Sequence, residues 1–175
     1  MNNTQPVSIV LRPGSRDDEP LVADLLAGLS PTTSFQRFLT GLGGPTRILA
    51  RDLLAARGDR GAVLAVGSAA DGARVVGHAC WVVTAGVADI GVVVTDAAQD
   101  RGIGTALFLA AADAGRAAGA SVVHLDLHPD NRRLVAALRR RLGRGALAWE
   151  HGLVTVDAPL SLVVPALDAA LPSAA

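Results

Sequence analysis

The sequence lacks lysine and tyrosine, because all 16 of its basic residues are arginine and its tyrosine count is 0. Without lysine, it cannot contain a phosphate-binding loop of the Gly-Lys-Ser/Thr type. Without tyrosine, no phenol is available to donate a proton in a reaction. Cys80 is the single cysteine. An internal disulfide is therefore excluded, and a reducing, cytoplasmic location is expected.

Net charge is also missing, since 16 basic residues balance 16 acidic ones. A neutral chain has no general electrostatic reason to bind nucleic acid or an anionic membrane, so neither is an expected partner. Residues 1–6 lack the basic-then-apolar pattern of a secretory signal. Asp113 and Arg116 interrupt the longest apolar run before it reaches the length of a membrane span.

What the sequence does contain is a high apolar content, 50% over 175 residues. This predicts a single globular domain over 1–175 with a sizeable core, in which Trp81 and Trp149 are expected in the core or lining a pocket. Hydrophobic periodicity predicts the elements. Strands are expected at 7–12, 62–66, 74–83, 87–94, 121–127, 146–149 and 153–156, and helices at 16–29, from 31 to before 41, 46–57, 99–118 and 132–142. Residues 157–175 form a C-terminal tail without a clear pattern.

The most informative stretch is 92–107, where a valine-rich strand passes through a polar turn into an alanine-rich helix. The turn carries the pattern Gln99-x-x-Gly102-x-Gly104. Unpaired backbone N–H groups and the positive end of the helix dipole meet at such a junction and favour an anion. The two glycines lack Cβ, so a phosphate can approach the backbone closely. Arg101 can add a charge-assisted contact.

This pattern after a valine-rich strand resembles the pyrophosphate loop of the GNAT superfamily of N-acetyltransferases. A dinucleotide fingerprint fits less well, because Leu107 occupies the place of its third small residue. The element order over 7–156 is also similar to that of GNAT domains. The protein-acetyltransferase branch is the most similar, on Arg12-Pro13, Asp18-Glu19-Pro20, Leu29-Ser30-Pro31 and Arg37-Phe38. The resemblance implies an α/β fold with a mixed, mainly antiparallel central sheet that splays between its fourth and fifth strands.

The resemblance also implies a site for acetyl-CoA as acyl donor, without a metal. The backbone of Val92, Val93 and Val94 would pair with the pantetheine arm, and one of these amides, at a bulge in the strand, would polarise the thioester carbonyl. Asn131 would bond the pantetheine or the edge of the site. The pyrophosphate would be cradled by Gln99, Asp100, Arg101, Gly102, Ile103 and Gly104.

Acetyl transfer to an amine needs a base, because holding an amine of pKa near 10.4 neutral at pH 7 costs roughly 4–5 kcal/mol. Asp89 stands where the protein-acetyltransferase branch has a glutamate base. Strand alternation puts Asp89, Gly91 and Val93 on one face. Two departures accompany this match. Aspartate is one methylene shorter than glutamate, and Leu138 stands near the place where many relatives have an acid tyrosine.

The expected function is therefore transfer of an acetyl group to a primary amine in a ternary complex. The acceptor is either a protein lysine or a small amine, and a homodimer is one oligomeric state the resemblance allows. A catalytically weak or inactive acyl-CoA-binding regulatory domain is the alternative, and an unrelated nucleotide-binding α/β domain is a third. His78 is expected to pack in its strand, with a base as the second reading. His124 and His128 flank the fifth strand without a third metal ligand.

Overall fold

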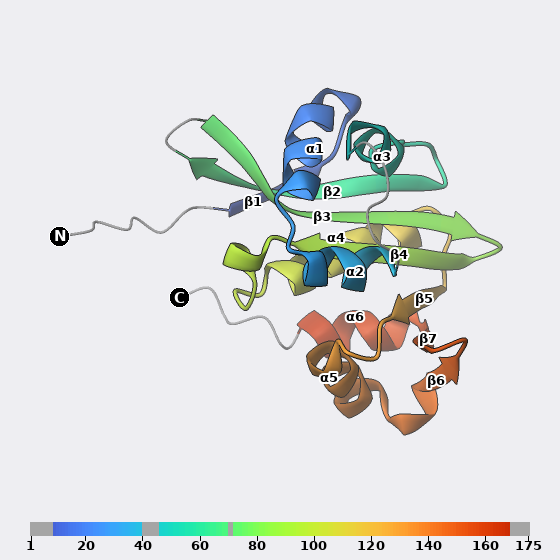
Figure 1. Ribbon diagram of the computed structural model, residues 1–175. Helices are drawn as coiled ribbons and strands as arrows, with labels where there is room; N and C mark the ends of the chain where they lie inside the picture. The colour runs from blue at the N-terminus through green and yellow to red at the C-terminus, as the bar shows by residue number, and fades with distance from the viewer. Residues whose placement is uncertain (1–8, 40–45, 70–71, 169–175) are drawn as a thin grey trace.

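A computed structural model of the chain describes residues 9–39, 46–69 and 72–168. Within them lies one sheet of seven strands in the order β1-β2-β3-β4-β5-β7-β6, shown in Figure 1. The strands are β1 Ile9–Pro13, β2 Arg60–Ala69, β3 Gly72–Thr84, β4 Val87–Val94, β5 Val122–Leu127, β6 Leu147–Glu150 and β7 Leu153–Pro159. The α-helices are α1 Glu19–Ala27, α2 Pro31–Phe38, α3 Thr46–Leu53, α4 Ile103–Ala117, α5 Arg132–Leu142 and α6 Leu160–Asp168. Among the described residues, no helix combines the length and apolarity that crossing a membrane requires.

Helices cover both faces of the sheet (Figure 1). On one face Leu26 of α1 and Leu54, directly after α3, are buried with Leu64 and Val93, and α2 lies over β4. On the other face the long helix α4 buries Leu107 and other apolar residues against the sheet, and α6 packs beside it. The predicted α/β architecture with a mainly antiparallel sheet is confirmed.

The sheet is antiparallel everywhere except between β4 and β5. These two strands pair in parallel only at Val87–Val122, Ala88–Val123 and Asp89–His124. Beyond Asp89, β4 remains paired with β3 up to Val94, while β5 remains paired with β7 up to Leu127. The predicted splay between the fourth and fifth strands is therefore present. It leaves one edge of 90–94 without a neighbouring strand among the described residues.

The bulge expected in β4 is absent. The register between β3 and β4 runs without a shift from Thr84–Val87 to Gly77–Val94. The irregularity lies instead between β2 and β3, at Ala65/Val66. An unbroken β4 keeps strict alternation along the strand, so its side chains divide cleanly between the two helical layers.

Several element bounds differ from the sequence expectation, as for α3, which ends at Leu53 instead of residue 57. Helix α4 begins at Ile103 instead of residue 99, because Gly102 has a left-handed φ of +78° and stands outside the helix. Helix α6 occupies 160–168, part of the region without a clear pattern. Even its exposed side carries an apolar residue, since Leu162 is 61% exposed. The sequence therefore lacks the alternation of apolar and polar residues that predicts a surface helix. Trp149 is 62% exposed on β6 and not in the core, because β6 is an edge strand.

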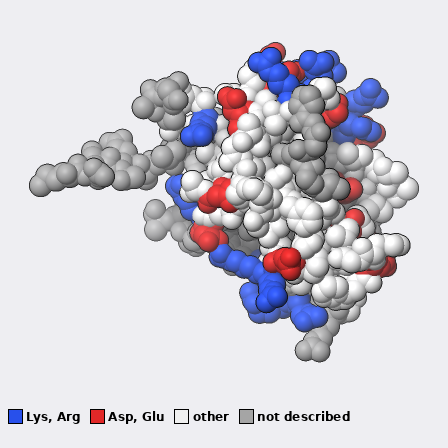
Figure 2. All heavy atoms as spheres, viewed as in Figure 1, with Lys and Arg blue, Asp and Glu red and all other residues white. Residues whose placement is uncertain are grey.

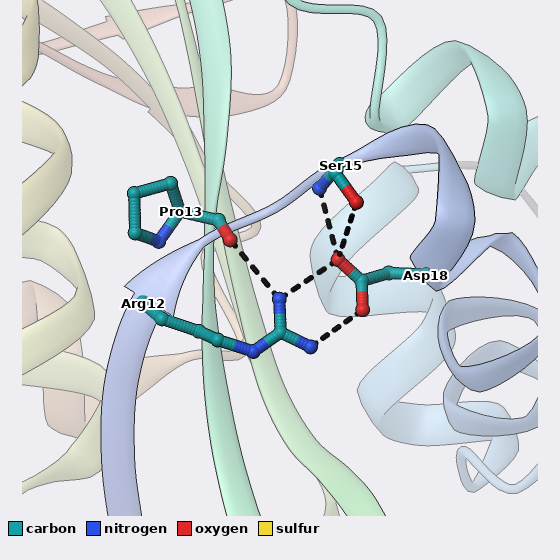
Figure 3. A network of polar contacts seen from close by, with 4 residues as sticks. All are labelled: Arg12, Pro13, Ser15 and Asp18. Atoms are coloured by element: carbon teal, nitrogen blue, oxygen red, sulfur yellow. Dashed lines mark hydrogen bonds and ion pairs between the residues drawn. The ribbon is translucent and has the colours of Figure 1, made fainter.

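An ion pair fixes the connection from β1 to α1 (Figure 3). Two nitrogens of the Arg12 guanidinium donate to the Asp18 carboxylate, at 2.8 and 2.5 Å. The Ser15 backbone N–H also donates to Asp18 at 2.9 Å. Hydrogen bonding from Arg12 is the main cause that lowers the pKa of Asp18 to about 2. This contact orders the segment that leads into the first helical layer.

Candidate active site

The loop between β4 and α4 has the geometry of an anion site. Gly102 is the N-cap of α4, and no side chain within 9–39, 46–69 or 72–168 caps the start of this helix. The first helical hydrogen bond comes from Ala106 N–H to the Gly102 carbonyl, at 3.0 Å. The amides of the first turn therefore remain available to a ligand. A Cβ added at Gly104 would meet its nearest neighbour, Val94 Cγ2, at 3.7 Å, so protein packing does not require a glycine there.

The side chain of Gln99 fastens this loop to its surroundings. Its amide donates to Thr33 Oγ1 on α2 and to the Val94 carbonyl, both at 3.2 Å. Asp100 has a left-handed φ of 62° and forms an ion pair with Arg133 on α5, the helix over which basic side chains gather in Figure 2. Arg101 is exposed. The contacts of these residues with a pyrophosphate stay a prediction. Sequence reasoning did not find the Gln99–Thr33 link, because it joins segments far apart in the chain.

Helix α2 is held over the site by the same loop. Asp96 accepts hydrogen bonds from the Ser30 N–H at 3.2 Å and from the hydroxyls of Ser30 and Thr33, each at 2.8 Å. The Ser30 hydroxyl is the main cause that lowers the pKa of Asp96. Phe35, in the middle of α2, contacts His128, which lies just after β5. The two rings meet edge to face, with their centroids 4.8 Å apart. The helix therefore bridges the open ends of β4 and β5.

Asp89, Gly91 and Val93 share the face of β4 that looks toward α1, α2 and α3, as strand alternation predicts. Val93 is buried in the cluster of α1 and α3, whereas Ile90 and Val94 lie in the cluster of α4. The Asp89 side chain is exposed. This carboxylate at the start of the splay is therefore accessible from solvent.

Asp89 adjoins a polar row across the next two strands. Its partner in the parallel ladder is His124, whose Nδ1 lies 2.9 Å from Asp157 Oδ1 on β7 and whose Nε2 lies 3.5 Å from Asp126 Oδ2. The hydrogen bond with Asp157 is the main cause that raises the pKa of His124. His124 therefore holds its proton more firmly than a free imidazole. The sequence alone could not predict these contacts of His124, because its neighbours Asp89 and Asp157 lie on two other strands.

Arg37 of α2 reaches down onto the same face. Its guanidinium lies against Gly91, where a Cβ would come within 3 Å of three guanidinium atoms, Nη2, Cζ and Nη1. Nη2 donates to Cys80 Sγ at 3.2 Å. His78, buried at 0% exposure, has its pKa lowered to about 4, by desolvation first and then by the charge of Arg37. His78 is thus a packed, neutral residue, as expected, and a poor candidate for the base.

Two other positions that the sequence singled out lie in α5 or directly before it. Leu138 is 2% exposed and lies in the core cluster that also contains residues of α4 and α6, so it belongs to the interior of the domain. Asn131 is the N-cap of α5, where Oδ1 accepts a 3.4 Å hydrogen bond from the Leu134 N–H. Its contact with pantetheine stays a prediction. Among the described residues, no group of three or more His, Cys, Asp or Glu side chains could hold a metal ion.

Comparison with known families decides what this arrangement belongs to. The model of the Acetyltransferase (GNAT) family matches residues 36–143, which include β4, the glycine loop and α5. The chain belongs to the GNAT family. This GNAT chain is therefore an acetyltransferase by family, and the family assignment drawn from the glycine loop is confirmed.

Solved structures show the same GNAT fold. The GNAT domain of the PAT protein of S. lividans has a TM-score of 0.70 at 18% identity, over 85% of this chain and 89% of that one. A GCN5-related N-acetyltransferase from Kribbella flavida has a TM-score of 0.64 at 22% identity, over 86% and 97%. YncA from Salmonella typhimurium, solved with its cofactor acetyl-CoA, has a TM-score of 0.59 at 16% identity, over 87% and 94%. No curated protein matches this GNAT chain.

Proposed function

We propose that this protein transfers an acetyl group from acetyl-CoA to a primary amine by direct attack in a ternary complex. One observation carries the proposal. The gap between β4 and β5 opens beyond Asp89, and the same strand β4 leads at its other end into an uncapped helix start. Acetyl-CoA is anionic at its pyrophosphate and carries the acetyl group at the other end. It would lie along β4, with the pyrophosphate at the start of α4 and the acetyl group in the gap near Asp89.

The donor end of the site would use the β4–α4 loop and the free edge of β4. The amides at the start of α4, with room left beside Gly104, suit a pyrophosphate. The unpaired edge of Val92, Val93 and Val94 suits an amide-containing pantetheine arm, which can pair like a strand. With no bulge in β4, the donor amide for the thioester oxygen would come from the regular strand edge.

The acceptor end would use the face that carries Asp89. The amine nitrogen attacks the thioester carbon, the C–N bond forms, and the C–S bond breaks with release of CoA as a thiolate. Asp89 would take the proton of the amine, directly or through a water molecule, and a solvent proton would reach the thiolate. The Asp89 side chain is exposed to solvent, which supports this proton path.

A regulatory acyl-CoA-binding domain without turnover is the second candidate. The absence of tyrosine and the aspartate in place of glutamate favour it. We further propose a cytoplasmic location, which the single Cys80 supports.

The test combines binding with turnover. Calorimetric titration with acetyl-CoA, and with ATP and NAD as controls, should show micromolar binding of acetyl-CoA alone. Thiol release is then followed over a panel of amines for the wild type, Asp89→Asn and the control Asp113→Asn, which alters an exposed pair on α4. We expect Asp89→Asn to lower kcat about 10²–10⁴-fold with unchanged acetyl-CoA binding. Binding without turnover on any amine would favour the regulatory domain, and an absence of binding would refute both.

A further inference from the structure

The guanidinium of Arg37 has no carboxylate partner among the described residues. Its Nη2 donates to the thiol of Cys80, and its Cζ lies 4.9 Å from the centroid of the Phe38 ring. Its Nε is buried and has no hydrogen-bond partner in the part of the chain that the structure describes. Charged groups withdrawn from water are normally paired, because losing hydration is costly. An arginine held this way is therefore short of an anion.

The position of Arg37 is set by the sheet beneath it. Its guanidinium occupies the space above Gly91 that any other residue's Cβ would need, with Nη2 only 2.2 Å from that point. Gly91 pairs with Cys80, so the guanidinium lies on the β3–β4 pair at the level where β4 has already left β5. The absence of a side chain at Gly91 thus admits the cation to the acceptor face.

Arg37 stands apart from the expected donor site. The start of α4 belongs to the layer of Ile103 and Val94, whereas Gly91 shares the opposite face of β4 with Asp89 and Val93. On that opposite face, Asp89 is two residues away from Gly91, which corresponds to about 6.6 Å along a strand. A guanidinium above Gly91 and a carboxylate on the neighbouring Asp89 therefore leave room for one amino acid, with a hydrogen bond of about 2.8 Å to each of its two ends.

We propose that Arg37 binds the carboxylate of the acceptor, so that the substrate is an amino acid or a similar small amine that carries a carboxylate. The guanidinium holds the carboxylate above Gly91, and the amine is left beside Asp89. This inference rests on the proposed N-acetyltransferase function and narrows its acceptor.

The experiment compares each amino acid with its own carboxamide. Thiol release at saturating acetyl-CoA is measured for these pairs with the wild type, Arg37→Gln and the control Arg51→Gln, whose guanidinium pairs with Glu19 on the surface. We expect the wild type to prefer the best acid over its amide at least 10-fold in kcat/KM. Arg37→Gln should lower kcat/KM for the acid about 100-fold, mainly through KM, and change the amide less than 3-fold. Arg51→Gln should retain the wild-type ratio.

A second variant keeps the positive charge of Arg37 but displaces its guanidinium. Gly91→Ala places a methyl group where the guanidinium lies, so the acid-to-amide ratio should fall toward 1 while thermal unfolding still shows a folded protein. Equal use of acids and amides by the wild type overturns the inference and leaves the acetyltransferase function standing. An equal loss for acid and amide in Arg37→Gln also overturns it. If no member of any pair releases thiol, the N-acetyltransferase function itself fails, and the inference falls with it.

Discussion

Asp89 and His124 are direct neighbours in the last pair of the short parallel ladder between β4 and β5. Both side chains lie on one face, because paired residues of adjacent strands point the same way. His124 is in turn bound to Asp157 on β7. The proposed base Asp89 therefore lies beside an ionisable pair, His124 and Asp157, whose net charge changes when the His124 imidazole loses its proton.

The charge of His124 predicts a pH dependence of stability. Because Asp157 raises the pKa of His124 in the folded state above its ordinary value of 6.5, the folded protein binds this proton more tightly than the unfolded chain. The stabilisation is complete below pH 6.5 and is lost as the pH rises through the higher folded pKa. Thermal unfolding between pH 5.5 and 9 should show a decline in Tm over the upper part of this range that Asp157→Asn reduces. An unchanged slope in Asp157→Asn would contradict this assignment.

Gly104→Ala should move stability and ligand binding in opposite directions. In the first turn of α4 the added methyl group meets only ordinary contact, 3.7 Å from Val94 Cγ2, and alanine favours a helix over glycine by about 0.5–1 kcal/mol. The same methyl group would occupy the approach of a phosphate. Urea unfolding should show greater stability, and titration should show weaker acetyl-CoA binding. Gly58→Ala, which meets no atom within 4 Å, is the control and should leave binding unchanged.

Removing the acid partner of Arg12 should destabilise the fold. Asp18→Asn keeps the shape of the side chain but removes the charge that accepts two guanidinium bonds and the Ser15 N–H. Charge-assisted hydrogen bonds contribute about 1.5–3 kcal/mol, so a loss of that order in the free energy of unfolding is expected at pH 7. The pKa of Asp18 is lowered to about 2. The wild-type advantage is therefore present above pH 3.8 and should fade as the pH falls toward 2, and a difference that persists at pH 2 would argue against the ion pair.

Asp96→Ala should loosen α2 without unfolding the domain. The three hydrogen bonds from Ser30 and Thr33 tie the start of this helix to the β4–α4 loop. Because they are exposed, the global loss should be about 1 kcal/mol. Amide hydrogen exchange in 31–38 should accelerate, and KM for the acceptor should rise, since α2 also carries Arg37. Unchanged exchange in 31–38 would show that other contacts hold the helix.

Leu138→Ala should cost stability and not specifically the chemistry. The side chain is 2% exposed within the core, and a buried leucine-to-alanine change costs about 2–5 kcal/mol through lost contacts and a cavity. Chemical denaturation measures this loss. A variant that unfolds like the wild type, but has a reduced kcat, would instead place this position in the proton path.

The sequence was sufficient for the parts of the fold that periodicity encodes. β4, the splay between the fourth and fifth strands, and helix α5 lie where the pattern and the family resemblance predicted them. It was insufficient where neighbours come from distant segments. The contact between Arg37 and Gly91 joins residues 54 positions apart. The contacts of His124 with Asp89 and Asp157 involve three strands. Helix α6 lacks a polar face, so its burial could not be seen before the packing was known.

The positions of the two tryptophans give this protein an unusually simple ultraviolet emission. With a tyrosine count of 0, all indole-region fluorescence comes from Trp81 and Trp149. The ring of Trp81 lies on Gly61, 2.4 Å from where a Cβ would stand, whereas Trp149 is 62% exposed. Iodide should quench the emission of Trp149, which lies at longer wavelength, and should quench the shorter-wavelength emission of Trp81 much less. The remaining signal then reports the contact between β2 and β3 without any label.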